Sequence, residues 1–259
     1  SWSFVKDLGH TIRTQSCVNP DIGHSVRLVH DTILPPPEPE YVDLGLSVKW
    51  ATFNVGATAP EDYGDYFAWG ETEPKETYSW ATYKWCDGTE NSLTKYCTNS
   101  QYGANGFTDN KTILDLTDDA AHVHWGENWR MPSDEEMTEL REKCTWTWTS
   151  INGVDGYEVT GPSGNSIFLP AAGFYFVDGY KSYGNGDYWS TKATNTDGAY
   201  HLYFYSDLHI RSSSYRYFGF AIRPVYDDRP KSKIIWYTDE AIKGEGQYAS
   251  LPYYCGWAY

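Results

Sequence analysis

The sequence has no long apolar runs and few basic residues. No stretch approaches the roughly 20 apolar residues of a membrane-spanning helix, which argues against membrane insertion by this segment. Lysine and arginine number 20 against 35 aspartates and glutamates, for a formal net charge of -15. An acidic surface repels phosphate backbones and anionic lipid headgroups. The charge balance therefore argues against nucleic acid as a partner.

Cysteine is also sparse, and its spacing excludes the common paired motifs. Five cysteines occur, and none forms a C-x-x-C pair, so the pattern argues against a zinc site. Cys86 and Cys97 enclose the short polar loop "CDGTENSLTKYC". Two interpretations stay open for this pair: a disulfide in an oxidising compartment, or two ordinary thiols.

Aromatic residues are plentiful. The chain carries 12 tryptophans and 23 tyrosines among 259 residues, far above ordinary usage. Such side chains combine a large apolar face with few rotatable bonds, which suits a recognition surface. The composition therefore favours a folded protein with a ligand-binding surface.

Proline marks the clearest domain boundary, in the stiff segment "ILPPPEPE". We expect a linker at residues 32–40, a domain at 41–226, and an extension or the start of a next module at 227–259. Residues 2–29 resemble residues 202–225, so residues 1–31 are predicted to be the last strands of a preceding similar domain. The opening "SWSFVKDLGH" lacks a basic start and an apolar stretch, which indicates a mature or partial chain rather than a signal peptide.

Local patterns predict two helices and many strands. "LTDDAAHVHWG" indicates a short helix with Asp118 as its N-cap. Ser133, with Glu136 three residues later, has the pattern of a capping box, and Met137 and Leu140 follow on one face with Cys144. Strands are expected at 46–56, 64–71, 157–161, 166–176, 187–193, 199–206 and 218–225. This combination predicts an α+β fold.

Several of these segments together resemble one known family. "DLGLSVKWATFNVGATAPEDYGDYFAWGET", "DDAAHVHWGENWRMPSDEEMTELREKC", "NSIFLPAAGF", "YWST" and "GFAIRPV" are similar, in this order, to the Fibrobacter succinogenes major paralogous domain. The resemblance covers residues 41–226. More distantly, "WRMPSDEEMTELR" resembles a helix of formylglycine-generating-enzyme-like domains, whose fold the variable proteins of diversity-generating retroelements share.

The resemblance implies a C-type-lectin-like fold, with two helices packed on a twisted, mainly antiparallel sheet and long loops. It also implies an extracellular or cell-surface location. An oxidase of the formylglycine-generating type needs a cysteine pair in the C-terminal third, and only Cys255 lies beyond Cys144. Other catalytic patterns are weak, because Glu71 with Glu73 and Asp118 with Asp119 are typical of solvated acidic positions. We therefore expect a non-enzymatic protein.

The final third of the domain carries the candidate binding face. Period-two alternation predicts that His201, Tyr203 and Tyr205 share one face of a strand while Leu202 and Phe204 enter the core. Tyrosine, serine, aspartate and histidine are also typical of antibody paratopes, and the resemblance places ligand contacts in this region. The predicted ligand-binding residues are Tyr188, His201, Tyr203, Tyr205, Asp207, His209, Ser213, Tyr215 and Tyr217.

The sequence thus predicts an adhesin-like domain of a multidomain surface or phage-associated protein. Its expected partners are a protein or glycan ligand and the neighbouring domains of the same chain. A structural repeat of a stalk or fimbria is the alternative. The Glu-Pro-Asn and Gln-Pro-Asp motifs of calcium-dependent lectins are absent, and no cofactor is expected. Asp109, Asn110 and Asp115 offer oxygen ligands for a structural calcium, although solvation is the simpler account of this acidic loop.

Overall fold

The computed structural model describes residues 38–126, 128–176 and 180–229. The chain divides into two compact units, residues 1–36 and 37–259, and every described residue belongs to the second. The predicted strands at 1–31, most of the predicted linker at 32–40, and the predicted extension beyond residue 229 lie outside the described residues. The α+β prediction is confirmed, because two α-helices accompany mainly antiparallel sheets.

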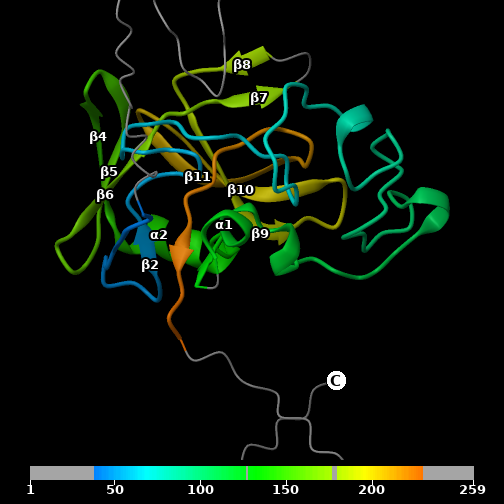
Figure 1. Ribbon diagram of the computed structural model, residues 1–259, viewed down its shortest axis with the longest axis horizontal. Helices are drawn as coiled ribbons and strands as arrows, with labels where there is room; N and C mark the ends of the chain where they lie inside the picture. The colour runs from blue at the N-terminus through cyan, green and yellow to red at the C-terminus, as the bar shows by residue number, and fades with distance from the viewer. Residues whose placement is uncertain (1–37, 127, 177–179, 230–259) are drawn as a thin grey trace, which may run out of the picture. The chain divides into compact units, whose positions relative to one another are not determined.

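Pairs of antiparallel strands build four small sheets (Figure 1). The first, in the order β1-β2-β12-β3, contains Tyr41–Val42, Lys49–Ala51, Val225–Tyr226 and Trp129–Arg130. The second, in the order β11-β10-β9, contains Leu208–Tyr215, Gly198–Tyr205 and Gly186–Ala193. The third, in the order β4-β5-β6, contains Thr145–Ile151, Val154–Thr160 and Ser166–Pro170. The fourth pairs β7, Phe174–Phe176, with β8, Tyr180–Ser182.

Helix α2, Asp134–Lys143, packs against β9, β10 and β11. Its predicted capping box is confirmed: the Ser133 hydroxyl accepts from the Glu136 N–H at 3.1 Å, and the Glu136 carboxylate accepts from the Ser133 N–H at 2.8 Å. Met137 and Leu140 are buried, as the helical spacing predicted. Three acidic residues in the first turn also favour the positive end of the helix dipole.

Helix α1, Ala120–Trp125, begins one residue later than the sequence predicted. Its N-cap is Asp119, whose carboxylate accepts from the His122 N–H at 3.2 Å. Asp118 instead ends a 3₁₀ helix, Leu116–Asp118, and accepts from the Tyr96 hydroxyl at 2.6 Å. The two acidic neighbours therefore anchor different segments. Among the described residues, no helix is both long and apolar enough to cross a bilayer.

A long segment between β2 and α1 contains two further 3₁₀ helices, Trp80–Thr82 and Ala104–Gly106. Two indole hydrogen bonds fasten this segment to β9. The Trp69 N–H donates to the Ser190 carbonyl and the Trp189 N–H donates to the Phe67 carbonyl, both at 2.8 Å. Both tryptophans are fully buried, so their polar atoms are satisfied inside the core.

Candidate functional site

The sheet β9–β10–β11 contains most of the predicted ligand-binding residues, but it divides them between its two faces. Directly paired residues point to the same face of a sheet. The register pairs His201 with Ser212, Tyr203 with Ile210 and Tyr205 with Leu208. On the other face it pairs Phe204 with His209 and Tyr200 with Ser213. The nine predicted residues therefore do not form a single surface.

Three of the nine are buried, which corrects the prediction that they face solvent. Tyr188 is fully buried, and its hydroxyl donates to the Pro170 carbonyl at 2.7 Å. Burial raises the pKa of Tyr188 to about 12. His201 and Tyr217 are also buried. The period-two rule fails at His201 because Phe220 packs against its ring on that face of β10.

The other six retain some exposure. The side chains of Tyr205 and Tyr215 are 41% and 43% exposed, and Asp207 and Ser213 are exposed as well. Tyr203 is partly buried, and its ring lies 6.0 Å from that of Tyr205. His209 is partly buried and stacks on Trp146 with ring centroids 4.5 Å apart.

A hollow lies where the exposed residues of β11 meet the turn between β9 and β10. We call it the Ser/Tyr hollow, and its volume is about 300 Å³. Hydroxyl-bearing side chains and one carboxylate are prominent in its lining. It is lined by Thr194, Thr196, Asp197, Gly198, Ser213, Ser214, Tyr215 and Phe218.

Tyr215 is held rigidly at the rim of the Ser/Tyr hollow. Its ring stacks on Tyr217 at 5.7 Å and meets the edges of Trp80 and Phe218 at 5.9 and 6.0 Å. These contacts fix the ring although 43% of the side chain is exposed. A fixed, exposed aromatic ring loses little conformational entropy when a ligand stacks on it.

The hollow also lies beside a cluster of serine, histidine and aspartate that the sequence did not suggest. The Ser214 hydroxyl lies 3.1 Å from Nε2 of His201, and Nδ1 of His201 lies 3.3 Å from the Asp187 carboxylate. Serine, histidine and aspartate follow in the order of acyl-transfer triads. Here His201 is only 3% exposed, and its ring packs against Phe220 at 4.7 Å. No local sequence motif predicts this cluster, because its members come from three different strands.

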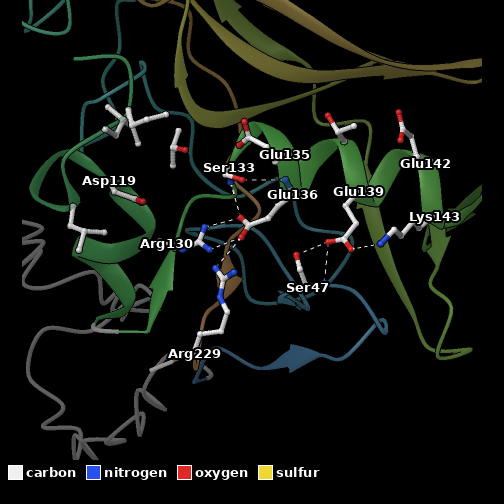
Figure 2. Close-up of a pocket in the computed structure, with 15 residues that line it drawn as sticks. Ser47, Asp119, Arg130, Ser133, Glu135, Glu136, Glu139, Glu142, Lys143 and Arg229 are labelled. Carbon is white, nitrogen blue, oxygen red and sulfur yellow. Dashed lines mark hydrogen bonds and ion pairs between the residues drawn. The ribbon is translucent and has the colours of Figure 1, made fainter. Parts of the chain in front are cut away.

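A groove of about 730 Å³ runs along α2 (Figure 2). Figure 2 shows its charged groups facing one another. Arg130 lies 2.6 Å from Glu136, and Arg229 also approaches Glu136, at 3.5 Å. Glu139 accepts from Ser47 at 2.5 Å and pairs with Lys143 at 2.8 Å. These contacts tie α2 to β3, to Ser47 ahead of β2 and to Arg229 beyond β12.

Three of the four acidic residues considered as catalytic groups form hydrogen bonds or ion pairs within the fold. Burial raises the pKa of Asp119 to about 6, while its carboxylate accepts from the Met131 N–H at 2.8 Å. Asp118 lies 2.6 Å from Lys95. Glu71 is buried and pairs with Lys75 at 2.8 Å, whereas Glu73 is exposed.

The two carboxylates considered as calcium ligands already contact N–H or ammonium groups of the protein. The Asp109 carboxylate accepts from the N–H groups of Tyr96 and Cys97, each at 2.8 Å. Asp115 lies 2.8 Å from both Lys95 and Lys111, and these contacts lower its pKa to about 2. Within the described ranges, no group of three or more histidine, cysteine or acidic side chains is arranged to hold a metal ion.

Cys86 and Cys97 are free thiols in the structure, contrary to the disulfide considered from the sequence. The Cys86 sulfur donates to the Trp80 carbonyl at 3.1 Å, and the Cys97 sulfur donates to the Asn99 carbonyl at 3.2 Å. Each thiol thus has its own partner, because the loop between them folds back on itself through a bridge from Cys86 to Leu93.

The comparisons with known proteins supply no relative. No protein-family model, curated protein or solved structure matches the chain.

Proposed function

We propose that this protein is a non-enzymatic, extracellular binding domain that holds a protein or glycan ligand at the Ser/Tyr hollow. The observation that carries the proposal is Tyr215, which is 43% exposed at the rim yet fixed by three aromatic neighbours. An exposed ring beside several hydroxyls offers stacking and hydrogen bonds to the same ligand.

The family resemblance supports the same role. We propose a C-type-lectin-like fold within a multidomain surface protein, since the α+β architecture and the long segment between β2 and α1 are compatible with it. In this proposal the α2 groove is a joint of the fold, and the exposed part of β11 carries the ligand.

The test is binding to arrays of glycans and of cell-surface proteins, followed by alanine substitution. Tyr215→Ala removes the rigid ring, so we expect affinity for any ligand found to fall about tenfold or more. Tyr203→Ala and Tyr205→Ala, on the opposite face of the sheet, are expected to have smaller effects.

Tyr41→Ala is the matched control, because Tyr41 is 46% exposed on a different sheet. Thermal melts establish that each variant is folded. The proposal fails if Tyr215→Ala binds as the unmodified protein does. It also fails if the tyrosine variants change only stability or assembly while neither array yields a ligand, which is the outcome that a stalk repeat predicts.

A further inference from the structure

A third cavity is lined by residues of the segment 63–78 and of the strands β7 and β8, which Figure 1 labels. Its volume is about 410 Å³. It shares no lining residue with the Ser/Tyr hollow. Tyr63, Tyr66, Tyr78 and Tyr175 contribute aromatic walls, and Lys181 of β8 enters from the hairpin. We call it the Lys181 pocket.

The ammonium of Lys181 is surrounded by aromatic rings. Its nitrogen lies 4.5 Å from the ring centroid of Tyr66, 4.8 Å from that of Tyr63, and 5.2 and 5.4 Å from those of Tyr183 and Tyr175. Each ring attracts the cation through its negative face. Burial nevertheless lowers the pKa of Lys181, because the rings replace water only in part.

Lys181 has no carboxylate partner among the described residues, since no acidic oxygen there lies within ion-pair distance. Lys75 lines the same pocket but pairs with Glu71 at 2.8 Å and donates to the Thr82 carbonyl at 2.9 Å. The positive charge of Lys75 is therefore neutralised, and that of Lys181 is available to a ligand.

The walls of the pocket are fixed before any ligand arrives. The Tyr66 hydroxyl donates to the Ala172 carbonyl, and the Tyr78 hydroxyl donates to the Tyr66 carbonyl, each at 2.5 Å. Tyr175 meets the edge of Tyr66 at 4.8 Å and stacks on Tyr78 at 5.7 Å. Such a site loses little entropy when it binds a ligand.

The chemistry of the lining selects the ligand. Tyrosine faces pack on the apolar C–H face of a sugar ring, and the Asp65 carboxylate on the wall can accept from sugar hydroxyls. Asp65 repels any anion, and it repels a doubly charged phosphate about twice as strongly as a single carboxylate. We propose that the Lys181 pocket binds a sugar residue bearing a single carboxylate, with that carboxylate on the Lys181 ammonium.

Isothermal titration calorimetry with a glucuronate-ended oligosaccharide, and with the same oligosaccharide ending in glucose, tests the proposal. We expect the acidic sugar to bind at least about tenfold more tightly, because a charge-assisted hydrogen bond adds to the stacking. The preference should weaken as salt is raised.

Lys181→Met should remove the preference for the acidic sugar, and Lys181→Arg should keep it. Lys84→Met is the matched control, because the exposed Lys84 also lies over a ring, 4.4 Å from Trp85, but outside the pocket. If Lys181→Met fails to fold, Lys181→Gln decides, since glutamine removes the positive charge but keeps a polar end at this partly buried position.

Equal binding of the two oligosaccharides overturns the proposal, as does a Lys181→Met protein that still prefers glucuronate. When Lys181→Met is unfolded, a Lys181→Gln protein that still prefers glucuronate overturns it. None of these outcomes bears on the Ser/Tyr hollow, whose test rests on Tyr215. The two proposals can therefore fail separately.

Discussion

Arg223 is fully buried, and its hydrogen-bond partners among the described residues are all neutral groups. Its guanidinium donates to the Asn54 side chain at 2.8 Å and to the carbonyls of Ala51, Thr52 and Phe168 at 2.9 to 3.1 Å. Burial lowers its pKa to about 10. The planar fork of arginine reaches several carbonyls at once, and the single point charge of lysine cannot do so.

Arg223→Met should therefore destabilise the fold by about 3 kcal/mol, because several buried acceptors lose their donor. Urea unfolding at pH 7 measures the change. Arg211→Met is the control, since Arg211 is 39% exposed and pairs with Asp134 at 2.6 Å, and its loss should cost about 1 kcal/mol or less. Equal losses in the two variants would contradict the structural role of Arg223.

The sequence pattern predicted the burial of some β10 side chains but not of others. Alternation along β10 assigned Leu202 and Phe204 to the core correctly, and both are buried. It placed His201 on the exposed face, but Phe220 covers that side of the strand. Burial by a segment about twenty residues away is a tertiary effect, so no local period could predict it.

The N-terminus of α2 carries both residues of a capping box, Ser133 and Glu136, so the sequence predicted it well. Ser133→Ala removes the hydroxyl that caps the Glu136 N–H, so we expect a loss of about 1 kcal/mol in the free energy of unfolding. Thermal and urea unfolding measure it. Ser150→Ala is the control because Ser150 is exposed in β4. A change no larger than that of the control would refute the capping role.

Elements with strong local signals were predicted, and those that depend on packing were not. Helix α2 and the strands β9 and β10 lie where the sequence predicted them, and β5 and β6 overlap the predicted strands at 157–161 and 166–176. The predicted strand at 64–71 is wrong, because this segment forms only an isolated bridge from Phe67 to Phe220. The strand β4, Thr145–Ile151, was not predicted. Its alternating Thr and Trp residues carry a strand pattern, but they follow the helix directly, without a glycine or proline to mark the change. The Lys181 pocket was also missed, since its walls come from segments a hundred residues apart.

Asp227 follows the last described strand and links it to β3 through Arg130, which also pairs with Glu136 of α2. Arg229 approaches it at 2.6 Å and Arg130 at 2.8 Å, and both lower its pKa from 3.8. The folded state therefore keeps the carboxylate charged to a lower pH than the unfolded chain does. The resulting stabilisation is complete above the unfolded pKa and is lost as the pH falls through the folded one.

We expect Asp227→Asn to lower the free energy of unfolding by about 1 kcal/mol at pH 7. The difference from the unmodified protein should shrink as the pH is lowered from about 4 towards 2. Urea unfolding at a series of pH values measures both effects. Asp155→Asn, at an exposed position, should show neither, and a gap that stays constant with pH would contradict this account.

The direction of the strands beside β2 has a mechanical consequence. Both β1 and β12 pair antiparallel with β2, so they run parallel to each other on its two sides. A pull on residue 41 and an opposite pull on residue 226 would act along the strands, and the hydrogen bonds between them would bear the load together rather than in succession. Tension carried along the chain through these two positions would therefore load the pairing of β2 with β1 and β12 in shear.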